Sequence, residues 1–117
     1  MFDMTLNYCL AFPAVVREEK WDDDVRFSVG EKLFCMISKT SPHQISLKCR
    51  LEDFHRLISQ PGIVPAPYLA RYHWVQIKQL DTLPVPQLQA LLQNAYDLVV
   101  STLPPEERAQ ILREQRV

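Results

Sequence analysis

Three short strand-like runs follow one another in the middle of the chain, and the segments between them are too short to hold a helix. The first, over residues 25–29, and the third, over residues 44–49, alternate apolar with polar side chains. The second, over residues 33–38, is apolar almost throughout. Turn-forming residues separate the runs, at Gly30 and at Ser41-Pro42. Short connections of this kind join antiparallel neighbours, so the sequence predicts a three-stranded antiparallel meander.

Helix-patterned segments surround the meander. The expected helices lie over residues 2–12, over residues 51–59, from Pro84 to a break at Thr102, and from Pro105 to about Glu114; a fourth strand lies over residues 74–79 and a charged connection over residues 17–24. Asp3 or Thr5 is expected to cap the first helix. The order α-β-β-β-α-β-α-α predicts one α+β domain over residues 1–117, two-layered, with helices packed on one face of an antiparallel β-sheet.

The composition is that of an ordinary globular protein, with 117 residues of which 47% are hydrophobic and 23% charged. Its apolar runs are too short to span a bilayer, and residues 1–4 lack the basic region of a signal peptide. Three cysteines without CxxC spacing, Cys9, Cys35 and Cys49, sit at apolar positions. We therefore expect buried, reduced thiols in a cytoplasmic protein that does not enter a membrane.

Metal sites and catalytic motifs are not expected. A zinc ion on Cys35, His43, Cys49 and His55 would need irregular ligand spacing, and the acidic run at residues 22–24 lacks the alternating ligands and glycine of a calcium loop. The sequence has no GxSxG, no HExxH and no glycine-rich phosphate loop, and it has two glycines in total. We expect no cofactor, no metal and no enzymatic activity.

Positive charge is concentrated in the middle of the chain, although the net charge is −1. Residues 26–78 hold eight Lys and Arg against three Asp and Glu, whereas the other residues hold five against eleven. Successive side chains of a strand point to opposite faces, so part of this charge should share one side of the sheet. The expected outward set is Arg26, Lys48, Arg50, Trp74 and Lys78. Four cations and an indole without a carboxylate suit phosphates with a base stacked beside them.

Each of these residues also has a purely structural interpretation. Trp74 would be core if the proline-rich segment before it folds over the strand. His73 would be a local hydrogen-bonding residue, and Lys48 and Lys78 would protect an open sheet from edge pairing and aggregation. Tyr68 and Tyr72 would then pack that segment onto the third helix. The apolar second strand leaves a further choice, since the outer face takes either Phe34 and Met36 or Leu33, Cys35 and Ile37.

Four segments carry a distinctive set of residues: VRFSVGEKLF at 25–34, LKC at 47–49, PGIVPAPYLARYHWV at 61–75, and Leu83-Pro84 before a helix with YDLV at 96–99. Together they resemble the MmcQ/YjbR family over nearly the whole chain. The resemblance implies a CyaY-like fold in a small bacterial cytoplasmic protein, and DNA binding through paired hairpins that act as wings. The family's recurrent positions correspond to Lys32, Lys48, Arg71, His73 and Trp74. Glu31 departs from the family's frequent glycine and places an acid at the tip of the first hairpin.

These observations lead to one main functional hypothesis and two alternatives. The main hypothesis is a monomeric, non-enzymatic DNA-binding protein whose hairpins at Gly30 and Ser41-Pro42 flank a duplex and bind it weakly, with strong salt dependence. The expected nucleic-acid-binding residues are Arg26, Lys32, Lys39, Lys48, Arg50, Arg71, His73, Trp74 and Lys78. The first alternative is a protein-interaction module that uses the same open sheet face. The second is a small-molecule pocket around Tyr68 and Tyr96.

Overall fold

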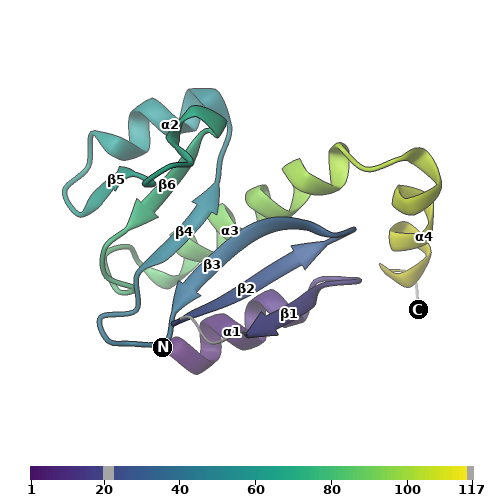
Figure 1. The fold of residues 1–117 in the computed structure, drawn as a ribbon, viewed down its shortest axis with the longest axis horizontal. Coiled ribbons are helices and arrows are strands. Elements are labelled where there is room, and N and C mark those ends of the chain that lie inside the picture. Colours follow the sequence, from purple (N-terminus) through teal and green to yellow (C-terminus); the bar gives the residue numbers. More distant parts are fainter. Residues whose placement is uncertain (20–22, 116–117) are drawn as a thin grey trace.

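The structure is a computed structural model that describes residues 1–19 and 23–115. Within these residues the chain forms four α-helices, six strands and one 3-10 turn (Figure 1). In chain order they are α1 (Phe2–Leu10), β1 (Val16–Glu19), β2 (Asp24–Val29), β3 (Lys32–Ser38), β4 (Ile45–Lys48), α2 (Leu51–Ile58), β5 (Ile63–Pro65), η1 (Ala70–Tyr72), β6 (Trp74–Ile77), α3 (Val85–Ser101) and α4 (Pro105–Gln115).

All six strands form one antiparallel sheet in the order β1-β2-β3-β4-β6-β5. The predicted meander is confirmed as β2, β3 and β4. The helices α1 and α3 lie on one face of the sheet, and α2 lies beside α3, where Leu57 and Leu91 line a common groove (Figure 1). The α+β class with helices on one face is therefore confirmed, while α4 stands at one end of the body (Figure 1).

The sequence analysis missed two edge strands. It expected a charged connection over residues 17–24, but Val16–Glu19 pairs with β2 as β1, and all four of its residues are exposed. A strand without a buried face has no alternation to detect. The short strand β5 pairs only with β6 and ends in Pro65, a residue that sheets tolerate at their edges. Trp21, within the expected connection, lies outside the described residues.

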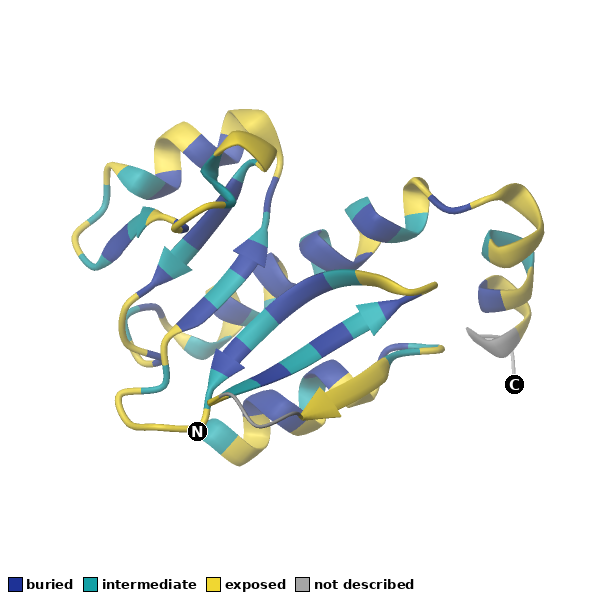
Figure 2. Cartoon of the chain, in the orientation of Figure 1, coloured by how far each residue is buried: buried dark blue, intermediate teal, exposed yellow. Residues whose placement is uncertain are grey.

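Strand alternation correctly predicted the core. In β2, Val25, Phe27 and Val29 are buried and the residues between them are half-buried, and β4 and β6 place Ile45, Leu47, Val75 and Ile77 on the same side (Figure 2). These side chains join one hydrophobic cluster with Leu88, Leu92 and Tyr96 of α3. The sheet therefore uses one face for the core, and its outer face carries the polar positions, as expected.

A β-bulge in β3 decides which residues of that strand face outward. Phe27 pairs with Cys35, yet the next residue, Ser28, pairs with Leu33, so Phe34 is an extra residue on β3. The extra residue changes the alternation, and Phe34, Cys35 and Ile37 are all buried. Leu33 and Met36 are half-buried on the outer face. Both outward sets considered for this strand were therefore wrong, because each assumed unbroken alternation.

The helices begin close to the expected residues, except at the first cap. Helix α1 begins at Phe2 with Met1 as its N-cap, so Asp3 and Thr5 already lie inside the helix and do not cap it. The Thr5 hydroxyl instead donates to the Met1 carbonyl at 2.8 Å. After the helix, the Pro13 carbonyl accepts a 2.7 Å hydrogen bond from the buried Tyr96 hydroxyl, which attaches the end of this segment to α3.

Candidate nucleic-acid interface

The segment from Ala66 to Tyr72 crosses the outer face of the sheet. The amide of Ala66 donates to the Trp74 carbonyl at 3.0 Å, and the side chain of Leu69 lines a hollow together with Met36 of β3. Trp74 is 5% exposed but does not belong to the hydrophobic core cluster. It is therefore buried on the outer face of the sheet. Trp74 is thus covered, as the structural interpretation expected, but it is not part of the core, and its indole offers no free ring face for a base.

Proline geometry and tight turns determine how this segment presents its side chains. The rings of Pro65 and Pro67 hold their own backbone angles, and the segment then turns into η1 through a 3.1 Å bond from the Leu69 amide to the Ala66 carbonyl. Tyr68 and His73, on either side of η1, have φ of 65° and 64°. The result is an ordered ridge with a fully exposed tyrosine, since Tyr68 is 98% exposed.

A notch opens beside this ridge, where β3 and β4 separate. These two strands pair only from Cys35 to Ile37, so the first residues of β3 extend past the end of β4. The gap has a volume of about 250 Å³. We call it the β3–β6 notch, and it is lined by Lys32, Leu33, Lys48, Tyr72, Trp74, Val99 and Thr102. Residues from three strands and from the end of α3 therefore meet there.

Three cations of the candidate set gather around Tyr72. The Lys48 Nζ atom donates to the Tyr72 carbonyl at 3.4 Å, and the Arg71 guanidinium lies 4.9 Å from the centre of the Tyr72 ring. Lys32 reaches the notch from β3 and donates to the Thr102 hydroxyl at 3.2 Å. Within residues 1–19 and 23–115, none of these three cations forms an ion pair with a carboxylate. Their charge is therefore available to an anionic ligand.

Two other predicted cations are paired within the chain. Lys39 lies 3.8 Å from a carboxylate oxygen of Glu19. Arg50 bonds to Asp53 at 2.9 Å, and Arg56 bonds to the same carboxylate at 3.2 Å. The Arg50 hydrogen bond is the largest influence that lowers the pKa of Asp53, so this carboxylate stays charged and holds both arginines. Neither Lys39 nor Arg50 belongs to the notch.

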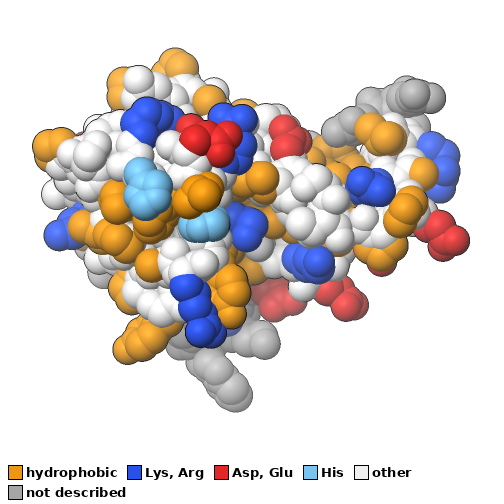
Figure 3. All heavy atoms as spheres, turned by 90° about the horizontal axis from the view of Figure 1, so that it is seen from above, with side chains coloured by type: hydrophobic (Ala, Val, Ile, Leu, Met, Phe, Trp, Pro, Cys, Tyr) orange, Lys and Arg blue, Asp and Glu red, His pale blue; other side chains and the backbone are white. Residues whose placement is uncertain are grey.

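The remaining predicted residues are dispersed. Arg26 lines a hollow that also contains Glu18 and Glu31, so its surroundings are acidic. Lys78 follows the far end of β6, and the ring of His73 lies 5.9 Å from Phe54 of α2. Figure 3 shows the same dispersion on the face that it presents, where Lys and Arg side chains are separated by acidic, histidine and apolar side chains. The structure thus brings together a subset of the nine predicted residues.

The first hairpin is packed against the chain and does not project as a wing. Gly30, at its tip, has φ of 57° and lies so close to the α3–α4 connection that an added Cβ would be 2.6 Å from a methyl carbon of Leu103. The carboxylate of Glu107 in α4 would lie 3.1 Å from the same point. An acid beside the tip, added to Glu31 in the turn itself, opposes any contact with phosphate.

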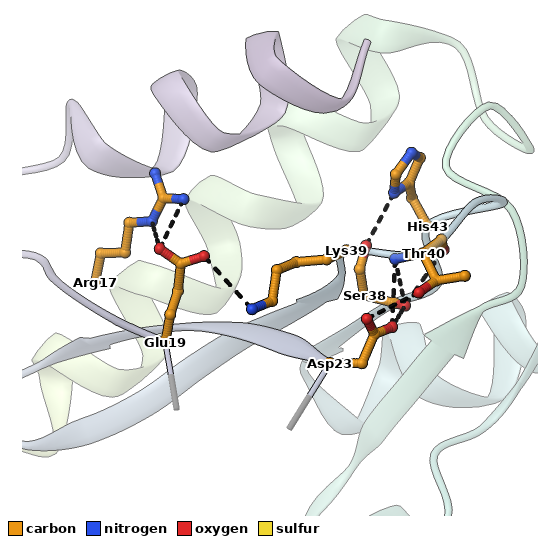
Figure 4. A network of polar contacts seen from close by, with 7 residues as sticks. All are labelled: Arg17, Glu19, Asp23, Ser38, Lys39, Thr40 and His43. Carbon is orange, nitrogen blue, oxygen red and sulfur yellow. Dashed lines mark hydrogen bonds and ion pairs between the residues drawn. The ribbon is translucent and has the colours of Figure 1, made fainter. Parts of the chain in front are cut away.

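The second turn is also held in place, as Figure 4 shows. The Asp23 carboxylate accepts hydrogen bonds from the hydroxyls of Ser38 at 2.6 Å and Thr40 at 2.8 Å, and these bonds lower the pKa of Asp23. The ring of His43 stacks on Phe2 of α1 at 4.2 Å. The two turns lie at opposite ends of the seven-residue β3, about 20 Å apart at the usual rise of a strand. They do not form a neighbouring pair.

The other proposed sites are not assembled. Among the described residues, no group of three or more His, Cys, Asp or Glu side chains is placed to hold a metal ion, and Cys35 is buried in the core. Tyr68 is exposed on the outer ridge, whereas Tyr96 is 1% exposed in the core on the helix side, so the pocket expected around this pair does not exist. Among the residues that the structure describes, no helix is both long and apolar enough to cross a bilayer.

The exposure of Tyr68 and Tyr72 was not predicted from the sequence, whose structural interpretation packed both side chains on the third helix. Tyr72 is 50% exposed and lines the notch together with Val99 of α3. The only sequence feature that bears on this exposure is the pair of prolines before Tyr68. They restrict the backbone conformation of the segment but do not indicate which of its side chains are exposed to solvent.

Comparisons with known proteins agree with this architecture. The YjbR family model matches residues 10–98. The uncharacterized protein YjbR of Escherichia coli K12 is 28% identical over 113 residues, which cover 92% of this chain and 94% of the relative. The crystal structure of Deinococcus radiodurans DR2400, a DUF419 domain, has a TM-score of 0.85 at 25% identity and covers 95% of this chain and 87% of its own. A protein from Pseudomonas syringae shares the fold, with a TM-score of 0.69 at 18% identity and coverage of 83% and 97%.

Proposed function

We propose that this chain, which belongs to the YjbR family, binds the phosphates of DNA at the β3–β6 notch and does not act as an enzyme. The family resemblance read from the sequence is confirmed, but the names of the relatives assign no activity, so the proposal is argued from the surface. The observation that supports it is the gathering of Lys32, Lys48 and Arg71 around Tyr72, with no ion pair to any carboxylate of the described residues.

Phosphate is the ligand group that this arrangement suits. Lysine ammonium groups and an arginine guanidinium are the usual partners of a nucleic-acid backbone, and they bind it without reading its sequence. The protein as a whole carries a net charge of −1, so any attraction must come from this local group and not from a general positive field. The binding is therefore weak and non-specific on its own.

We further propose that the protein is a cytoplasmic monomer. All three cysteines are buried as free thiols, which fits a reducing compartment. Wings are not part of the proposal, because both turns that would form them are held by contacts within the chain.

Salt dependence is the sharpest test of this proposal. Three phosphate contacts give a slope of about −2.7 in a plot of log affinity against log salt for duplex DNA, so affinity should fall on the order of 40-fold between about 50 mM and about 200 mM salt. Fluorescence anisotropy of a labelled duplex at several salt concentrations measures this slope. Lys48→Glu and Arg71→Glu should each weaken binding about tenfold or more and make the slope shallower by about one.

A matched control is Arg113→Glu, which makes the same change of charge at an exposed position on α4. It should leave both affinity and slope nearly unchanged. The proposal is wrong if no duplex or single strand binds at low salt, or if the control weakens binding as much as Lys48→Glu does. Purification from a lysate with and without nuclease addresses the protein-interaction alternative, since a protein partner would remain bound after nuclease treatment.

A further inference from the structure

We infer that the nucleic acid is held as a single strand, with one of its bases stacked on the ring of Tyr68. This inference rests on the proposed function, because it assigns a class of ligand to the same notch. It starts from the conformation of Tyr68 and not from the charges.

Tyr68 combines two unfavourable features that nothing within the described chain offsets. Its φ of 65° places a bulky side chain in the left-handed region, which is unfavourable for an L-residue. Its side chain is 98% exposed, so it contributes no burial, and within the described residues it makes no hydrogen bond or ring contact. Strained residues of this kind concentrate at binding sites, where the strain holds a side chain ready for a ligand.

The neighbours of Tyr68 indicate the chemistry of that ligand. Four residues later Tyr72 is half exposed, with the Arg71 guanidinium over its ring at 4.9 Å and Lys48 Nζ at 3.4 Å from its carbonyl oxygen. Two exposed tyrosines alternate with cations along a short ridge that ends at the notch. Aromatic rings beside a positively charged groove are how proteins bind single strands, because each base stacks on a ring while the backbone follows the cations.

Duplex DNA fits the ridge less well than a single strand. Paired bases are stacked on one another, so their flat faces are not available to a tyrosine ring. A duplex would meet this surface through its phosphates alone, because entering a groove needs a projecting helix or ribbon. Both turns of the meander that could project are held down, at Gly30 by Leu103 and at Thr40 by Asp23. A protein partner at Tyr68 would need acidic side chains opposite Arg71 and Lys48, and the test below distinguishes this case.

The test compares two probes and two variants of one residue. The probes are a labelled DNA strand of roughly 15 nucleotides and the same strand annealed to its complement, each titrated by anisotropy at low salt. The strand should bind about tenfold tighter than the duplex. Tyr68→Ala should weaken strand binding about fivefold or more and leave duplex binding unchanged, whereas Tyr68→Phe, which keeps the ring, should bind the strand as the wild type does. Because Tyr68 is almost fully exposed, neither variant should disturb the fold.

The outcomes separate this inference from the proposal that it extends. If strand and duplex bind equally, or if Tyr68→Ala binds the strand as the wild type does, the inference is overturned. In that case, if Lys48→Glu fails to bind either probe, the proposal that the notch binds phosphate would still stand. If neither probe binds at low salt, both statements fail together. If Tyr68→Ala no longer binds a protein partner that resists nuclease but still binds the DNA strand, the inference would be overturned in favour of a protein interface.

Discussion

Replacing Gly30 by alanine tests whether the first hairpin is packed or projects freely. Alanine at φ of 57° costs about 1 kcal/mol in any setting. In this structure its Cβ would also lie 2.6 and 2.8 Å from the two methyl carbons of Leu103. Leu103 is 4% exposed and belongs to the core, so it cannot swing into solvent, and overpacking of this kind costs a further 1–3 kcal/mol or so. We expect Gly30→Ala to destabilise the protein by about 2–4 kcal/mol.

Urea unfolding of the wild type, Gly30→Ala, Leu103→Ala and the double variant separates the cost of the backbone conformation from the cost of the clash with Leu103. In the background of Leu103→Ala the clash is removed, so the alanine at position 30 should then cost only about 1 kcal/mol. Gly62→Ala is a matched control, because Gly62 also has a left-handed φ of 83° but faces the half-buried side chain of Thr82 at 3.0 Å. It should cost less than Gly30→Ala. A coupling energy below about 0.5 kcal/mol between positions 30 and 103 would refute the packed arrangement and restore a free hairpin.

Three further predictions concern interactions within the fold. Asp53→Asn should destabilise the protein by about 1–2 kcal/mol, because Arg50 and Arg56 lose a charged acceptor but remain largely in solvent. The pKa of Asp53 is lowered in the folded state, so its contribution to the free energy of unfolding should be complete above about pH 4 and decrease as the pH falls further. If the urea midpoints of the wild type and Asp53→Asn stay equally far apart down to about pH 3, this expectation is contradicted. Tyr96→Phe should cost about 1 kcal/mol in thermal unfolding through loss of the bond to Pro13, and an unchanged midpoint would show that this bond contributes nothing. Burial raises the pKa of the Cys49 thiol to about 11, so a thiol reagent at pH 8 or so should label it only after unfolding, and rapid native labelling would refute its burial.

Local sequence patterns predicted the elements that bury one face. The alternation at Val25 and Phe27, and at Ile45 and Leu47, named core residues correctly, because side-chain direction in a strand follows from backbone geometry alone. The segment preceding Trp74 carried the family resemblance, which the family model confirms. The exposed strand β1 gave no such pattern. The bulge at Phe34 changed the alternation of β3, and the Phe34 ring packs against Phe12 and Tyr96, which are distant in the sequence.

The candidate site could be predicted only in part. Lys32, Lys48 and Arg71 were chosen from the sequence. Lys32 and Lys48 line one notch and Arg71 contacts Tyr72 at its border, but this grouping depends on where β3 and β4 separate. Lys39 and Arg50 were chosen by the same argument and are paired with acids. DNA binding itself stays a prediction. Charge and strand alternation identify candidates, but they do not identify which acid or segment lies beside each one.

By itself the sequence determined the family, the α+β class, the meander and the face on which the core residues of β2, β4 and β6 lie. Tertiary structure alone decided that Trp74 is covered, that Gly30 is packed against Leu103, and that Tyr68 ends in solvent. The physical reason is the range of the interactions involved. The direction of a side chain is set by its own backbone, whereas its burial and its charge partner depend on segments that are distant in the chain and meet it only after folding.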